Sequence, residues 1–104
     1  MSTNTHLIYE VNLEIDPSIY EAYKTWLNKH ITEMLLQPGF VSANCYQVKD
    51  TTQQSCLLTI HYHVTSDHAL QDYLTHKAPF MRKEGYEKFG QNFKATRRIL
   101  YAMS

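Results

Sequence analysis

Three side chains that can bind or act on a small molecule recur at helical spacing. Trp26, His30 and Glu33 lie at positions i, i+4 and i+7, so a helix would present them as one stripe that can face a sheet. An indole, an imidazole and a carboxylate could hold an electron-rich aromatic compound and set its ionisation. Tyr9 and Tyr73 could add aromatic walls. Such stripes are also typical of a packed core, so both interpretations stay open.

The C-terminal part of the chain carries most of the positive charge. Residues 75–104 hold seven of the ten Lys and Arg and two of the ten Asp and Glu, which gives +5 against −5 for the preceding residues. Arg82, Arg97 and Arg98 are the best candidates for contact with an anion, because a guanidinium can hold a carboxylate with two hydrogen bonds. Arg97 and Arg98 would lie on opposite faces of a strand, so at most one lines a given pocket. We favour Arg97; a surface salt bridge is the alternative.

His61 and His63 form a local pattern that can bind a metal. On a strand they would project from one face with Cβ atoms ~7 Å apart, and two imidazoles at that separation can bind Zn²⁺ or Cu²⁺. Glu10 on a neighbouring strand could be a third ligand. Histidines that form hydrogen bonds across a dimer interface explain the same pattern better, so we predict no metal. The six histidines also predict a mild pH response of self-association.

The signatures of several enzyme classes are missing from the sequence. It has no nucleophile elbow, glycine-rich phosphate loop, paired-carboxylate motif or HExxH motif, and we expect no cofactor. Gly39, Gly85 and Gly90 are each expected at a turn or a helix end. Cys45 and Cys56 lack CxxC spacing, so we expect buried, reduced thiols rather than a disulfide.

Length and composition predict one domain that spans residues 1–104. The chain has 43% hydrophobic residues, few glycines and prolines and no low-complexity tract, so it should fold around one core. No apolar run approaches the length of a membrane span, and the N-terminus lacks the features of a signal peptide. Zero net charge disfavours a dedicated nucleic-acid binder. We therefore expect a cytoplasmic protein that binds neither membrane nor nucleic acid.

Alternating and continuous apolar segments predict four strands. They are expected at residues 7–15, 40–48, 56–64 and 93–103. A polar turn at residues 51–55 should join the second and third strands as a hairpin.

Two helical regions are predicted between these strands. The first covers residues 17–36, with Asp16 as N-cap and Pro17 at the first helical position. The second begins after Ser66 and is restarted by Pro79, and it ends near residue 89. The order strand, helix, strand, strand, helix, strand is that of the ferredoxin-like βαββαβ fold. It is an α+β fold with a four-stranded antiparallel sheet and its helices on one face.

The second face of this sheet is left without a covering layer. The residues expected to face the helices from the third strand are Cys56, Leu58, Ile60, Tyr62 and Val64. The residues expected on the open face are Ile8, Glu10, Asn12 and Glu14 of the first strand and Leu57, Thr59, His61 and His63 of the third. This mixture suits an enclosed but hydrated interface. We therefore predict a homodimer that packs sheet against sheet.

Four stretches of the sequence resemble a known family. They are IYEVNL in the first strand, WLNKHITEM followed by PGF, HYH in the third strand, and KAPFMRKEGYEKFGQNFKATRR at the end. Over nearly the whole chain these stretches resemble a small bacterial domain family of unknown function. That family lies within the dimeric α/β-barrel superfamily, which includes antibiotic-biosynthesis monooxygenases. The resemblance implies a ferredoxin-like subunit that pairs through its sheet, but no particular activity. Relatives commonly carry His before the Ala-Pro pair, where this chain has Lys77, with His76 one position earlier.

The superfamily resemblance implies several activities to compare with these residues. Cofactor-free oxygenation of aromatic compounds is compatible with the stripe described above. Haem degradation would need an Asn on the first strand, a Trp near the end of the third strand and a His on the second helix. Asn12 and His76 could fill two of these places, but the third strand offers Tyr62 and no Trp, which disfavours haem degradation.

Two hypotheses therefore remain open. The first is an enzyme or binder of a small aromatic or carboxylate-bearing compound, held between the first helix and the sheet by Tyr9, Trp26, His30, Glu33, Tyr73 and Arg97. The second is a non-catalytic homodimeric module whose histidines and charges serve the interface. An enclosed pocket beside Trp26 and His30, with at least two polar groups that lack protein partners, would favour the first.

Overall fold

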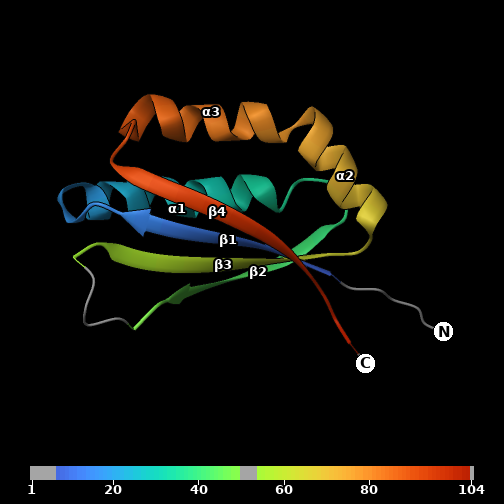
Figure 1. Cartoon of the computed structure of the whole chain (residues 1–104). Coiled ribbons are helices and arrows are strands. Elements are labelled where there is room, and N and C mark those ends of the chain that lie inside the picture. Colours follow the sequence, from blue (N-terminus) through green and yellow to red (C-terminus); the bar gives the residue numbers. More distant parts are fainter. Residues whose placement is uncertain (1–6, 50–53, 104) are drawn as a thin grey trace.

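The computed structural model describes residues 7–49 and 54–103, and it shows a four-stranded antiparallel sheet with helices on one face (Figure 1). The strands are β1 (Leu7–Ile15), β2 (Phe40–Gln47), β3 (Cys56–Val64) and β4 (Phe93–Tyr101), in the spatial order β2-β3-β1-β4. The predicted ferredoxin-like fold is confirmed. Residues 50–53 of the predicted hairpin turn lie outside the described residues.

The first helical region begins as predicted and ends slightly earlier. A short 3-10 helix, η1 (Pro17–Ile19), leads into α1 (Tyr20–Met34). The Asp16 carboxylate accepts a hydrogen bond from the Ser18 N–H at 2.8 Å, which satisfies one of the free donors at the helix start. Gly39 follows the helix with a φ of +84°, a conformation that favours glycine.

The second helical region consists of two helices. α2 (Asp67–His76) is capped by Ser66, whose hydroxyl oxygen accepts a hydrogen bond from the Ala69 N–H at 3.1 Å. α3 (Ala78–Phe89) has proline in its first turn, which confirms the predicted restart. In Figure 1, α1 and α3 extend along the same face of the sheet, and α2 lies at one end of that layer.

The core lies between the sheet and the helices. Alternate residues of β1 and β3 are buried there, as predicted, and the buried set of these two strands is Leu7, Tyr9, Leu13, Ile15, Leu58, Ile60, Tyr62 and Val64. The helices contribute Tyr23, Leu27, Met34, Leu70, Tyr73 and Phe89. β1 pairs with both β3 and β4, so it is one of the two inner strands, and residues of the site described below lie on it.

Two expectations about single residues are wrong. Gly85 lies inside α3 rather than at a helix end; an added Cβ would lie 3.0 Å from Cη2 of Trp26, so the missing side chain lets the indole pack on the helix backbone. Cys45 is exposed rather than buried, because β2 is an edge strand. Cys56 is partly buried.

Within residues 7–49 and 54–103, no helix is both long enough and apolar enough to span a membrane.

Candidate functional site

A pocket lies between α1, α3 and the helix-facing side of the sheet. Five of the six predicted ligand-binding residues line it: Tyr9, Trp26, His30, Tyr73 and Arg97. α3 adds Arg82, Gly85 and Tyr86. The pocket leaves a cavity of about 40 Å³, which exceeds the roughly 10–15 Å³ that one water molecule needs.

Glu33 lies outside this pocket, which corrects the prediction for that residue. The sheet-facing side of α1 is occupied by Tyr23, Leu27 and Met34, so the stripe that contains Glu33 faces α3 instead. Glu33 borders a separate hollow that is lined by Phe80, Met81, Lys83, Glu84 and Glu87 of α3. Helical spacing predicts one stripe for Trp26, His30 and Glu33, but it does not say which neighbouring element or which hollow each residue meets.

Trp26 and His30 form a stacked pair in the pocket wall. Their ring centroids lie 4.7 Å apart, with an angle of 17° between the ring planes. Burial lowers the pKa of His30 to about 4; the charge of Arg97 acts in the same direction, and that of Glu84 opposes it. The imidazole is therefore neutral at pH 7. Among the described residues, its buried Nδ1 has no hydrogen-bond partner.

Arg82 is a pocket residue that the sequence indicated only as one of three candidates for anion contact. Its Nη2 donates a hydrogen bond to the Tyr9 hydroxyl at 2.9 Å. Its Nε is buried and has no partner within the described part of the chain. A buried polar group without a partner costs about 1–3 kcal/mol. His30 and Arg82 thus both line this pocket, and each carries a buried nitrogen atom without a partner among the described residues.

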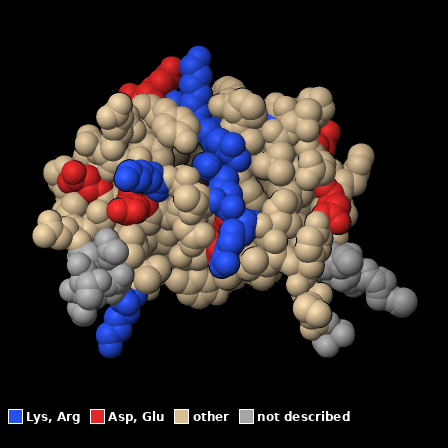
Figure 2. All heavy atoms as spheres, viewed as in Figure 1, with Lys and Arg blue, Asp and Glu red and all other residues tan. Residues whose placement is uncertain are grey.

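The charge of Arg97 acts on the tyrosines of the pocket. The Tyr73 hydroxyl donates to the Met34 Sδ at 3.1 Å. Burial, then Tyr9, raises the pKa of Tyr73 to about 12, and the charges of Arg82 and Arg97 oppose that rise. Figure 2 shows Lys and Arg side chains in a band that runs from α3 across β4, the two elements that carry these arginines. The pocket therefore combines neutral aromatic walls with two cations.

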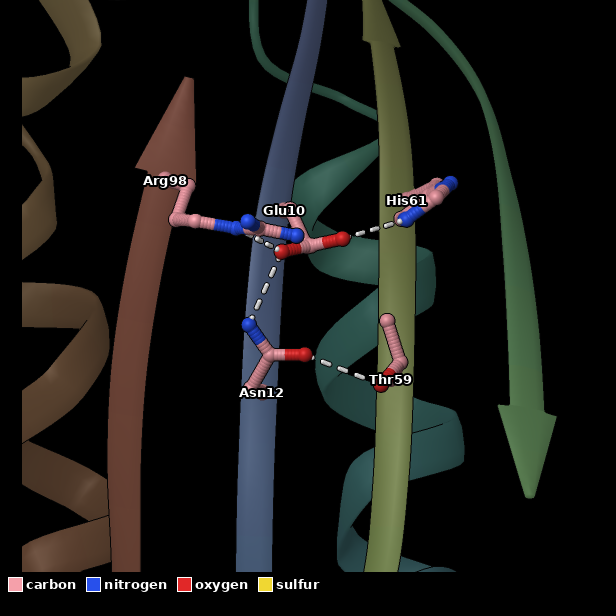
Figure 3. A network of polar contacts seen from close by, with 5 residues as sticks. All are labelled: Glu10, Asn12, Thr59, His61 and Arg98. Carbon is pink, nitrogen blue, oxygen red and sulfur yellow. Dashed lines mark hydrogen bonds and ion pairs between the residues drawn. The ribbon is translucent and has the colours of Figure 1, made fainter. Parts of the chain in front are cut away.

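The opposite face of the sheet carries a polar network that is centred on Glu10 (Figure 3). The Glu10 carboxylate accepts hydrogen bonds from Arg98 Nε at 2.6 Å, Asn12 Nδ2 at 2.9 Å and His61 Nε2 at 2.8 Å. Asn12 Oδ1 accepts one from the Thr59 hydroxyl at 2.9 Å. The bonds from Arg98, Asn12 and His61, with Arg98 the strongest, lower the pKa of Glu10 to about 2, although its burial opposes this. Because the carboxylate is ionised and can only accept, His61 Nε2 carries a hydrogen atom and donates the hydrogen bond to Glu10.

Glu10, His61 and His63 are not assembled into a metal site. His63 Nε2 lies 3.1 Å from Asn44 Oδ1 on β2, whereas His61 binds Glu10 on β1. No group of three or more His, Cys, Asp and Glu able to hold a metal ion is found in residues 7–49 and 54–103. Both histidines have partners within their own chain.

The residues considered for haem degradation are not brought together. Asn12 belongs to the network on the open face, away from the pocket, and His76 lies on the surface of α2, 3.8 Å from Asp72. Arg97 and Arg98 do lie on opposite sides of β4, as the alternation predicted, because Arg97 lines the pocket and Arg98 binds Glu10.

The chain belongs to the family described as Domain of unknown function (DUF4286), whose model matches residues 6–103. No curated protein matches the chain.

Solved structures with the same fold come from several sources. A dimeric ferredoxin-like protein from an uncultured marine organism is 8% identical, with a TM-score of 0.70 and coverage of 96% of this chain and 97% of that one. A variant of SnoaB, a cofactor-independent oxygenase from Streptomyces nogalater, is 12% identical, with a TM-score of 0.67 and 94% of each chain covered. A candidate antibiotic biosynthesis monooxygenase from Bacteroides thetaiotaomicron VPI-5482 is 22% identical, with a TM-score of 0.59 and coverage of 95% and 89%. At these identities the likeness shows the fold alone.

Proposed function

We propose that the pocket between α1, α3 and the sheet binds a small aromatic or carboxylate-bearing compound. The observation that carries this proposal is that two residues of one pocket, His30 and Arg82, each have a buried nitrogen atom, Nδ1 and Nε, without a partner among the described residues. In a core that served packing alone, such nitrogen atoms would be exposed to solvent or would have hydrogen-bond partners within the chain. A ligand would satisfy both.

The aromatic walls and the fold relatives support the same proposal. Tyr9, Tyr73 and Trp26 line the same pocket as His30 and Arg82, so apolar walls and a few polar groups occur together, as in many small-molecule sites. One protein of this fold is described as a cofactor-independent oxygenase. Oxygenation of a bound aromatic compound is therefore the first reaction to test once a ligand is found.

A fluorescence titration tests the pocket, because Trp26 is the single tryptophan and lines it. Aromatic acids, quinols and haem are titrated, with Trp26→Phe as the blank and calorimetry as a second readout. We expect a saturable signal that is lost in His30→Ala. It should persist in His63→Ala, a matched change on the opposite sheet face. Absence of saturable binding for every compound would refute the proposal and favour a non-catalytic module.

We also propose that the protein forms a homodimer through the open face of the sheet. The helices cover only the other face (Figure 1), and the open face carries half-buried residues such as Ile8, Leu57 and Leu100 around the Glu10 network. One structural neighbour is described as dimeric. Such a mixture of apolar and hydrogen-bonded groups is typical of protein interfaces.

Sedimentation equilibrium tests this second proposal. The native chain should sediment as a dimer, and Thr96→Glu, which places a charge on the open face of β4 opposite Asn12, should shift the equilibrium to monomer. Thr32→Glu, on the exposed surface of α1, should leave the dimer intact. A monomeric native chain at high protein concentration would exclude this interface.

A further inference from the structure

The charge of the pocket restricts what it can bind. Arg82 and Arg97 both line it, and within residues 7–49 and 54–103 neither belongs to an ion pair. The acidic residue Glu84 raises the pKa of His30 through its charge. It borders the separate hollow that also contains Glu33, and it is not part of the pocket lining. Two cations in a partly buried site favour an anion over a neutral or cationic ligand.

Arg82 has one hydrogen bond that is not made within the described residues. Its Nη2 is used by the Tyr9 hydroxyl at 2.9 Å, which holds the guanidinium in place, while its buried Nε is unpaired. A guanidinium presents its N–H groups in a planar fork, so an oxygen atom at Nε would be held in a fixed direction. His30 Nδ1, also unpaired, can donate to the same ligand when the neutral ring carries its proton there.

The size of the cavity decides which part of a ligand enters it. The cavity measures about 40 Å³, whereas a cavity that binds benzene is roughly 150 Å³. A carboxylate group therefore fits, but an aromatic ring does not. A ring can lie at the mouth beside Tyr86, which lines the pocket, is 50% exposed and stacks on Phe93 with ring centroids 5.4 Å apart.

We infer that the ligand is a small aromatic carboxylate or a similar monoanion that binds with its charged group innermost, between Arg82 and Arg97, and its ring at the mouth beside Tyr86. This inference rests on the ligand-binding function proposed above. It adds the charge and the orientation of the ligand and makes Arg82 and Arg97 the residues that determine specificity.

The test compares compounds that share a ring and differ in the head group. Benzoate, benzamide and benzyl alcohol are titrated by calorimetry, and acetate is added as a competitor that represents the head group alone. We expect benzoate to bind at least about tenfold more tightly than the two neutral compounds, which is roughly the effect of one charge-assisted hydrogen bond. Acetate should displace benzoate, and the affinity for benzoate should fall as salt is added.

Substitutions test whether Arg82 and Arg97 bind the carboxylate group. Arg82→Met and Arg97→Met should each weaken benzoate binding about tenfold or more and leave the weak binding of benzamide unchanged. Arg82→Lys keeps the positive charge but loses the planar fork of N–H groups. Its affinity for benzoate should therefore lie between that of the native chain and that of Arg82→Met. Lys94→Met, which removes a positive charge from the other side of β4, should change little. Circular dichroism and thermal unfolding check that each variant folds.

The outcomes separate this inference from the proposed function. Equal affinity for benzoate and benzamide, with both lost in His30→Ala, would overturn the anion inference and leave the pocket as a binding site. Benzoate binding that survives in both Arg82→Met and Arg97→Met would also overturn it. No saturable binding of any compound would overturn both.

Discussion

The Glu10 network predicts a specific loss of stability when its carboxylate is removed. In Glu10→Gln the hydrogen bonds from Arg98, Asn12 and His61 lose the negative charge that strengthens them. These bonds lower the pKa of Glu10 from 4.5 to about 2. At about 1.4 kcal/mol per pKa unit, the upper limit of the effect is about 3.5 kcal/mol. Because solvent beside the exposed Arg98 screens the charges, we expect a loss of about 1–2 kcal/mol at pH 7.

The pH dependence of this loss distinguishes the charge from packing. A carboxyl group whose pKa is lowered by folding contributes fully above its unfolded pKa, near 4.5, and its contribution disappears as the pH falls toward 2. More than half of the stability difference between the native chain and Glu10→Gln should therefore be gone at pH 3. Urea unfolding between pH 7 and pH 3 measures this.

Two controls complete the Glu10 experiment. Glu14→Gln removes an exposed carboxylate from the same strand face and should cost little. Because Glu10 lies on the proposed dimer face, unfolding is repeated at several protein concentrations to separate association from stability within the chain. A difference that is the same at pH 7 and pH 3, or that is absent at pH 7, would refute the reasoning.

Three further predictions concern other residues. Gly85→Ala brings a Cβ to 3.0 Å from Trp26, so we expect altered tryptophan emission and a net loss of stability despite alanine's better helix propensity of about 1 kcal/mol; unchanged emission would contradict this. The His30 imidazole should titrate by NMR with a midpoint of about 4. Since its folded pKa lies below the ordinary 6.5, this group lowers stability as the pH falls from 6.5 toward 4, and a midpoint near 6.5 would disprove the burial argument. Ser66→Ala should cost about 1 kcal/mol of unfolding free energy by removing the cap on Ala69, whereas Ser66→Gly should cost only a few tenths.

Local signals explain why most of the fold could be predicted. Alternation of apolar residues defines which side of β1 and β3 is buried, and the caps at Asp16 and Ser66 mark helix starts through bonds that span two or three residues. The same alternation assigns Arg97 and Arg98 to opposite sides of β4. These features depend on neighbours in sequence, so the sequence contains them directly.

The parts of the site that were missed depend on how distant elements pack. Glu33 fits the helical stripe, yet the position of α3 places it over a different hollow. Arg82 enters the pocket because its helix lies where Nη2 reaches Tyr9, 73 positions earlier in the chain. The absence of a side chain at Gly85 is explained only by the contact of Trp26 with α3 at this position. Each of these contacts requires knowing which helix faces which, and periodicity alone does not supply this.

The two faces of the sheet are linked through the register of β4. Among the strands of residues 7–49 and 54–103, β4 lies at an edge of the sheet and pairs only with β1, where Arg98 lies opposite Glu10. A slip of one residue would turn every side chain of β4 to the other face, and Arg97 would leave the pocket. In the observed register the 2.6 Å contact with the Glu10 carboxylate holds Arg98 on the open face, and the alternation along β4 then places Arg97 on the pocket side. The pairing of Arg98 with Glu10 on the open face and the presence of Arg97 in the pocket on the other face therefore depend on one and the same register of β4.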